Sequence, residues 1–367
     1  MRFQTAAFDE TVFQEQLVEH LGTDHCSISV SAKQIRECLP KVIWHCETPI
    51  LRTAPVPLWL LSKLVREHNF KVVLTGEGAD EIFGGYNIFK EAKVRNFWGR
   101  QPLSALRPRL LEKLYPYVFD NPVRGCAFLY QFFAVEQTDL VNPLFSHQIR
   151  WRNGRRNTAF FSSSLRDQVG GVDSLQHVAS SLPDDFAQRD LFSRTQALEV
   201  AIFLSNYLLS SQGDRMLMAN SIEGRFPYLD HRVIEFACRV PRRFRIHGLD
   251  EKFLLKQAAR KVIPDELVDR AKQPYRAPIS RSFFGDVRME YVEEMLSETQ
   301  ILAKGYFNAD KVGRLVAKCR NRQGSLLSER ENMALVAILS TQLLDQQFVR
   351  DFPAYRAEEV SSPVVYD

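Results

Sequence analysis

Apolar residues recur every three or four positions in three stretches near the start of the chain, over residues 13–21, 35–43 and 57–68. Polar and charged residues occupy positions between them, which is the pattern of helices with one buried face. Gly22, directly after the first stretch, is a typical helix stop. The pattern therefore predicts three helices before residue 70.

Short apolar runs with β-branched residues follow these helices at residues 28–30 and 71–74. Strands that alternate with helices are typical of a parallel sheet, because parallel strands need a crossover connection. We therefore expect an α/β fold in which residues 71–74 form a buried strand. Further along, residues 199–209 are apolar nearly all round, which predicts a buried helix, and two more helices are expected at 310–319 and 330–344.

Composition narrows the class of protein. The chain has 367 residues, of which 45% are apolar and 25% charged, and its net charge of +4 gives no reason to expect a nucleic-acid partner. No run approaches the ~18 apolar residues that a membrane span needs, and the first ten residues show no secretory signal pattern. The six cysteines include no CxxC pair. We interpret them as reduced core residues of a cytoplasmic protein without a membrane partner.

Residues 75–86, TGEGADEIFGGY, carry most of the recognisable chemistry. They follow the second predicted strand, and open parallel sheets bind ligands beyond the carboxyl ends of their strands. Gly76 and Gly78 let backbone N–H groups approach an anion or a ribose without a side chain in the way. This position favours a nucleotide-binding loop that opens into a helix from Ala79.

Three acids crowd the same turn. Mg²⁺ prefers one or two carboxylates together with phosphate oxygens, so Asp80 is a candidate ligand, and Glu77 could act as a base or a positioning group. The competing interpretation is that Asp80 and Glu81 only complement the dipole of the helix that starts there. The acids alone leave both interpretations open.

The order and length of the motifs add a resemblance. Five segments in order resemble the synthetase domain of the glutamine-hydrolysing asparagine synthetase family, which has an ATP-pyrophosphatase fold. They are LGTDH (21–25), TGEGADEIFGGY (75–86), GDRMLMANSIEGRFPYLDHRVIEFA (213–237), EKFLLKQAAR (251–260) and PDELVDRAKQPYRAPI (264–279). The resemblance implies a parallel sheet of the adenine-nucleotide α-hydrolase (ATP-pyrophosphatase) type, truncated at its N-terminus, with a large and mostly helical C-terminal half.

The resemblance also implies a reaction. The family uses ATP and Mg²⁺ to convert aspartate to asparagine through β-aspartyl-AMP, with ammonia as the nucleophile. By motif match, Glu77 assists ammonia attack, Asp80 holds the metal and pyrophosphate, and Lys272 neutralises the phosphates, for which Lys252 and Lys256 are weaker candidates. The residues matched to ATP binding are Thr75, Gly76, Glu77 and Gly78.

Two family features have no counterpart in the expected place. The glutaminase domain and the pyrophosphate loop SGGxDS should both precede LGTDH. Three explanations are open: a complementing N-terminal chain, a truncated gene product or a mis-set start. In each case we expect an exposed sheet edge, and with it poor solubility or association with a complementing chain. A similar string, VGGVDS at 169–174, follows a polar stretch without strand character. We interpret it as a turn between two helices.

Two polar features of the third segment have a structural interpretation. Asp230 is expected to cap the helix that follows it. Asp214 and Arg215 are expected to form a structural pair at a helix start.

The expected organisation has four parts. Residues 1–90 form the α/β nucleotide-binding part, 91–185 a helical insertion, 186–350 the helical remainder and 351–367 a loosely ordered tail. The basic, aromatic stretch 87–156 is either a partner-facing or lid element or a solvated helical face.

Three functions remain open. The first is the asparagine synthetase reaction. The second is another acyl-adenylate synthesis, as in β-lactam synthetase or a peptide cyclase, where the amine is internal; the Glu77 carboxylate favours ammonia instead. The third is a degenerate, non-catalytic subunit that binds a nucleotide or a partner.

Overall fold

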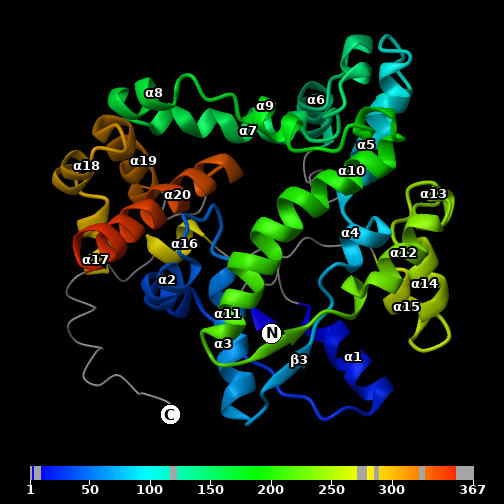
Figure 1. Cartoon of the computed structure of the whole chain (residues 1–367), viewed down its shortest axis with the longest axis horizontal. Coiled ribbons are helices and arrows are strands. Elements are labelled where there is room, and N and C mark those ends of the chain that lie inside the picture. Colours follow the sequence, from blue (N-terminus) through cyan, green and yellow to red (C-terminus); the bar gives the residue numbers. More distant parts are fainter. Residues whose placement is uncertain are drawn as a thin grey trace.

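The computed structural model describes residues 2–3, 10–115, 122–270, 279–284, 289–321 and 327–352. Helices dominate this part of the chain, and its strands are short (Figure 1). None of the helices in it is long and apolar enough to cross a membrane. The expected tail from residue 351 falls almost wholly outside the described residues.

The strands form two parallel pairs. β1 (Arg2–Phe3) pairs with β2 (Ser29–Val30), and β3 (Val72–Leu74) pairs with β4 (Glu223–Arg225). The strands predicted near residues 28–30 and 71–74 and their parallel direction are confirmed. β4 was not predicted, because Glu-Gly-Arg has no strand pattern of its own.

The prediction that β3 is buried is wrong. Its outward residues Val72 and Leu74 are 45% and 75% exposed. In the described part of the chain β4 is the one strand that pairs with β3. Val72 and Leu74 are two residues apart and so share one face of the ribbon, and that face meets solvent.

The three helices predicted near the start are confirmed, and local signals explain their ends. The first stops at Gly22, whose φ of 61° is the left-handed conformation that glycine tolerates best. The second starts at Ser31, whose hydroxyl accepts from Gln34 N while the Gln34 side chain accepts from Ser31 N. The helices are α1 (Thr11–Leu21), α2 (Ala32–Cys46) and α3 (Pro55–Glu67).

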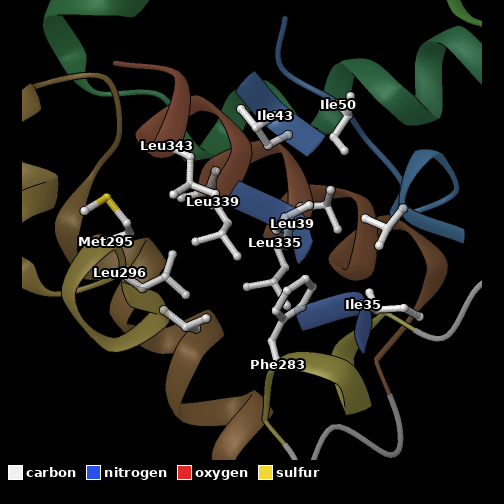
Figure 2. Close-up of a cluster of buried hydrophobic side chains, with 14 of the residues drawn as sticks. Ile35, Leu39, Ile43, Ile50, Phe283, Met295, Leu296, Leu335, Leu339 and Leu343 are labelled. Carbon is white, nitrogen blue, oxygen red and sulfur yellow. The ribbon is translucent and has the colours of Figure 1, made fainter. Parts of the chain in front are cut away.

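The largest apolar core joins α2 and α3 to the C-terminal helices. Ile35 and Leu39 on α2 interlock with Leu335 and Leu339 on α20, all fully buried (Figure 2). This packing confirms the helices predicted at 310–319 and 330–344. The C-terminal helices are α16 (Ser280–Phe283), α17 (Glu290–Met295), α18 (Glu298–Lys304), α19 (Ala309–Asn321), α20 (Glu329–Asp345) and the π-helix η9 (Gln346–Arg350).

The described residues between 79 and 188 form mainly short helices, with a second apolar core around Trp98 and Phe145. The boundary expected at residue 90 falls inside α5, while the division into four parts stays a prediction. The helices are α4 (Ala79–Phe83), α5 (Asn87–Gly99), η2 (Arg107–Lys113), α6 (Pro122–Phe132), η4 (Gln137–Val141), α7 (Gln148–Arg155), η5 (Arg156–Phe160), α8 (Ser163–Val169), α9 (Ser174–Ser180) and η6 (Phe186–Gln188).

The string VGGVDS behaves as predicted. It lies between α8 and α9, where Asp173 caps α9 by accepting from Leu175 N and Gln176 N. Its glycines therefore lie in a turn that directly follows helix α8 and not a strand.

One continuous helical rod crosses the molecule from upper right to lower left (Figure 1). It is made of α10 (Leu191–Leu198), the π-helix η7 (Glu199–Asp214) and α11 (Arg215–Met218). The prediction that residues 199–209 are buried is wrong, because of these only Glu199 and Leu204 are buried. The rod packs against α2, α3, α4 and α5, yet most side chains of 199–209 remain half-buried or exposed.

Helices α12 to α15 lie together on the right-hand side of Figure 1. Asp230 caps α12 as predicted, accepting from Arg232 N. The elements are η8 (Pro227–Leu229), α12 (His231–Arg239), α13 (Arg242–Arg245), α14 (Phe253–Ala259) and α15 (Asp265–Val268).

The five cysteines whose side chains are described are all free thiols. Cys46 and Cys319 are buried, and burial raises the pKa of each to about 12. Cys26 and Cys238 are exposed, so the prediction that the cysteines are core residues is wrong for these two.

Candidate functional site

The loop after β3 is shaped by its glycines. Thr75 N still donates to Arg225 O at 2.9 Å, so the ladder with β4 continues one residue past the strand. Gly78 has a φ of 91°, and a Cβ there would lie 2.3 Å from the Leu229 side chain. A Cβ at Gly76 would meet nothing within 4 Å. The chain therefore turns tightly at Gly78 and leaves open space at Gly76.

The Gly84–Gly85 pair closes the other end of α4. Gly84, at a φ of 72°, ends the helix against the Phe192 ring. A Cβ on Gly85 would lie 2.0 Å from Asp80 Oδ1, so any side chain there would displace the Asp80 carboxylate. The second glycine of this motif is therefore required by Asp80, a relation that the sequence alone did not reveal.

Asp80 forms an ion pair with Lys252. The distance from Lys252 Nζ to Asp80 Oδ1 is 2.9 Å, and the two side chains are largely but not completely buried. By motif match Lys272 was expected to neutralise the phosphates, with Lys252 as a weaker candidate. The structure brings Lys252 to the loop, whereas Lys272 lies outside the described residues.

Glu77 and Thr75 each carry a buried polar atom in this loop. Glu77 Oε2 and Thr75 Oγ1 are buried and have no hydrogen-bond partner within the described ranges. Burial, and then the charge of Glu77, raises the pKa of Asp214. Two carboxylates and an unsatisfied hydroxyl thus share a partly dry region, which favours a cation, a proton or a polar ligand there.

Asp214 reaches this region from the last turn of η7. Gly213 makes that turn possible, because a Cβ on it would lie 2.6 Å from Leu208 O. The neighbouring Arg215 turns elsewhere: its guanidinium donates to Glu47 at 2.7 Å and to Cys46 O at 2.9 Å. The predicted Asp214–Arg215 pair is therefore wrong, and Asp214 is an acid of the site that sequence analysis had treated as structural.

Glu81 is turned into the protein. It accepts from the Tyr86 hydroxyl at 2.7 Å. Burial raises the pKa of Glu81 despite this hydrogen bond, and burial together with Glu81 raises that of Tyr86. Glu81 therefore anchors α4 instead of facing a ligand. Of the three acids in the turn, Glu81 thus has a structural role.

Lys256, the other candidate lysine, serves the scaffold. Its ammonium bonds Asp250 and lies 3.7 Å from Glu251. Across the part of the chain that the structure describes, no group of three or more His, Cys, Asp or Glu side chains could hold a metal ion by itself. A metal at Asp80 would therefore take most of its ligands from a bound substrate or from water.

Comparison with known proteins places the chain in a family. A sequence model described as "Asparagine synthase" matches residues 1–346. The chain is 28% identical over 323 residues to "Asparagine synthetase [glutamine-hydrolyzing] 1" of Bacillus subtilis, an alignment that covers 86% of the chain and 47% of the relative. A "Putative asparagine synthetase [glutamine-hydrolyzing]" of Mycobacterium bovis is 29% identical over 76% of the chain and 40% of its own length.

Another relative has a different name. "Amidase chyE" of Penicillium rubens is 22% identical over 86% of the chain and 48% of its own length. The chain thus spans about half the length of the curated relatives it matches.

Proposed function

Because the chain belongs to the asparagine synthase family, we propose that it carries the ATP-dependent amidation of aspartate to asparagine through β-aspartyl-AMP. The observation that carries this proposal is the loop after β3. This loop contains Glu77 and Asp80, has open space at Gly76, and brings Lys252 into an ion pair with Asp80. The proposal includes the ATP-pyrophosphatase type of fold, with which the parallel β3–β4 pair agrees.

The nucleotide would bind at the open space of Gly76. Thr75 Oγ1 and Glu77 Oε2 are buried polar atoms without a hydrogen-bond partner in the described residues, and such atoms normally gain one from water or a ligand. The residues assigned to ATP on this basis are Thr75, Gly76, Glu77 and Gly78.

The donor set fits a magnesium–pyrophosphate group through Asp80. Bound Mg²⁺ would supply charge neutralisation on the leaving pyrophosphate. Asp80 would hold it, and the Lys252 ammonium, already 2.9 Å from that carboxylate, gains a second anionic partner when phosphates arrive. Lys272 remains in the proposal as a further phosphate-neutralising residue.

The two chemical steps place different demands on the chain. The aspartate side-chain carboxylate attacks the α-phosphorus and pyrophosphate leaves. Ammonia then attacks the acyl carbon, AMP leaves, and the nitrogen loses a proton. Glu77 is the proposed acceptor of that proton.

The expected partner and compartment are part of the same proposal. A chain that supplies a glutaminase domain would deliver ammonia from glutamine, as the printed names of the relatives imply for those proteins. We propose that this partner and a cytoplasmic location hold for this chain too.

The amidase-named relatives support a second candidate. "Amidase chyE" aligns over 86% of the chain, as extensively as the first relative. The second candidate is therefore acyl-adenylate formation on a carboxylate other than aspartate, or with an amine other than ammonia.

The test is pyrophosphate release by the purified full chain with MgATP, aspartate and ammonium, compared with Glu77→Gln and Lys272→Met. Aspartate-dependent release that falls in both variants supports the proposal. Release that is driven by other carboxylates and not by aspartate favours the second candidate. If a glutaminase-bearing chain from a complete relative also fails to restore release, the chain is a non-catalytic subunit and the proposal is wrong.

A further inference from the structure

Three consecutive charged residues before α14 are each held by a different partner. Asp250 bonds Lys256 of α14, and Glu251 pairs with Lys90 of α5 at 2.9 Å. Lys252 pairs with Asp80 of α4 at 2.9 Å. This short turn therefore ties α14, α5 and α4 together, and its last residue is the lysine of the candidate site.

The Glu251–Lys90 pair is the most deeply buried of these contacts. Lys90 is 8% exposed and Glu251 4%. Burial by itself raises the pKa of Glu251, but the hydrogen bond and charge of Lys90, helped by Lys256, outweigh it and the net pKa is lowered. The Glu251 carboxylate thus keeps its charge although burying a charge is unfavourable unless its partner is well placed, and Lys90 is that partner.

Helix α5 holds the same loop at a second point. Lys93, one helical turn after Lys90, donates from Nζ to Gly248 O at 2.7 Å. Backbone hydrogen bonds between His247 and Asp250, in both directions, close the loop in between. Two lysines on one face of α5 therefore fix both ends of the loop 248–251.

The residue that follows has an unfavourable backbone. Lys252 has φ 50° and ψ 33°, the left-handed region in which a side chain with a Cβ is strained. Such a conformation persists only where its surroundings determine it, and it aims Nζ at Asp80. The neighbouring anchored residue, Glu251, is the nearest source of that constraint.

From this geometry we infer that Lys90 and Glu251 are positioning residues, whose buried ion pair sets the turn 250–252 and so holds Lys252 against Asp80. The pair touches no reacting atom; it acts through Lys252. The turn's dependence on Lys90 stands by itself, whereas the effect on phosphate binding rests on the proposed function.

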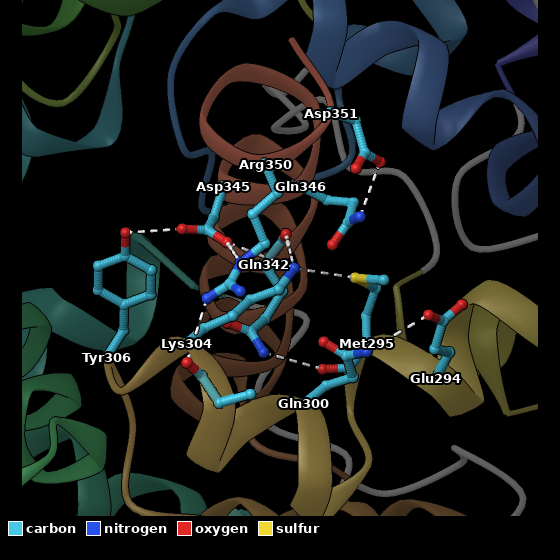
Figure 3. A network of polar contacts seen from close by, with 11 residues as sticks. Glu294, Met295, Gln300, Lys304, Tyr306, Gln342, Asp345, Gln346, Arg350 and Asp351 are labelled. Atoms are coloured by element: carbon cyan, nitrogen blue, oxygen red, sulfur yellow. Dashed lines mark hydrogen bonds and ion pairs between the residues drawn. The ribbon is translucent and has the colours of Figure 1, made fainter. Parts of the chain in front are cut away.

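The chain offers a matched control in another buried pair. Lys304 Nζ donates to Gln342 O at 2.7 Å and lies 3.6 Å from Asp345, which also receives bonds from Tyr306 and Arg350 (Figure 3). This network belongs to α18 and α20, in the core opposite the site (Figure 1). Lys304→Met therefore breaks a buried ion pair without touching the turn.

The first measurement needs no activity: amide hydrogen exchange of peptides covering residues 247–256 in the full chain. In Lys90→Met we expect about tenfold faster exchange there, since the turn opens locally. Lys90→Arg should restore protection, and Lys304→Met should leave it unchanged. Glu251→Gln, the mildest variant, provides the answer if Lys90→Met does not fold. Unchanged exchange in Lys90→Met or, failing that, in Glu251→Gln overturns the inference.

The second measurement is binding of inorganic pyrophosphate with Mg²⁺ by calorimetry. Lys90→Met should weaken it by about tenfold through misplacement of Lys252, with the KM for aspartate unchanged. Faster exchange with unaltered pyrophosphate affinity would overturn the link to the site. If the wild-type chain binds no pyrophosphate, the proposed function fails there, while the exchange experiment still decides whether Lys90 sets the turn.

Discussion

The core between α2 and α20 and the layer around α4 are held together by different interactions. In the core, fully buried aliphatic side chains such as Leu39 and Leu335 remove apolar area from water (Figure 2). Around α4, Ile82 and Phe83 join a small apolar cluster, but ionic and polar contacts are added to it, as in Lys90–Glu251, Lys252–Asp80 and Tyr86–Glu81. Burial of apolar side chains stabilises the first region. In the second region, removing charged groups from water is unfavourable and offsets part of the stability that their pairing provides.

The difference separates stability from function. An apolar core tolerates any arrangement that fills its volume, but a charged layer works only when each charge keeps its partner. Substitutions around α4 should therefore change activity more than stability, and substitutions between α2 and α20 should do the reverse. The following predictions test that separation.

Asp80→Asn should have the largest effect. It removes the carboxylate that faces Lys252 and the proposed metal, so we expect aspartate-dependent pyrophosphate release to fall by about 10³-fold, or ~4 kcal/mol. The midpoint of urea unfolding should change little, because Asp80 contributes few apolar contacts. A normal rate would show that Asp80 is only a helix-charging residue.

Leu335→Ala should have the opposite profile. Leu335 is fully buried in the core, so its truncation should lower the free energy of unfolding by about 3 kcal/mol. The measurement is urea denaturation followed by circular dichroism, with KM for ATP as the second readout. A rise in KM at a temperature where the variant is folded would contradict the separation.

Gln196→Leu is an intermediate case beside the site. Gln196 donates to Ile82 O at 2.8 Å and Glu81 O at 3.1 Å, and accepts from Arg245 at 2.9 Å. Loss of these bonds at the end of α4 should cost about 1–2 kcal/mol of stability and also slow pyrophosphate release.

Its matched control is Gln347→Leu. Gln347 donates to Pro40 O at 2.8 Å on the core side. This control should lose a similar stability with no change in rate. If both variants had the same rate, Gln196 would be structural only.

Glu331→Gln should have the smallest effect on the free energy of unfolding, and this effect should disappear as the pH falls toward 2. Burial raises the pKa of Glu331, but hydrogen bonds from Lys318 and Ser328 lower it to about 2, below its value of ~4.3 in an unfolded chain. The stability it adds is therefore complete above about pH 5 and is lost as pH falls toward 2.

Glutamine keeps the capping geometry at Ser328 but cannot titrate. Wild type should be more stable than the variant by about 1 kcal/mol at pH 7 and equal to it near pH 2. Urea unfolding at pH 7, 4 and 2.5 measures this. A difference that does not change with pH would mean that the Glu331 charge contributes nothing.

The sequence predicted local features well because they depend on neighbours in the chain. Gly22 ends α1 and Asp230 starts α12, as their backbone and capping chemistry require. It predicted β3 but not its exposure, since exposure depends on which distant elements cover the faces of the ribbon. It could not predict β4, whose residues form a strand only because Val73 and its neighbours offer them hydrogen bonds.

The candidate site divides in the same way. The order of residues in TGEGADEIFGGY was sufficient to select Glu77 and Asp80 and, with the other segments, the family. Only the tertiary structure brought Lys252 and Asp214 to that loop, from positions far away in the chain, and Glu251 to Lys90. The motif is a local string whose chemistry is visible in its letters, whereas an ion pair between distant residues exists only after the chain has folded and excluded water from it.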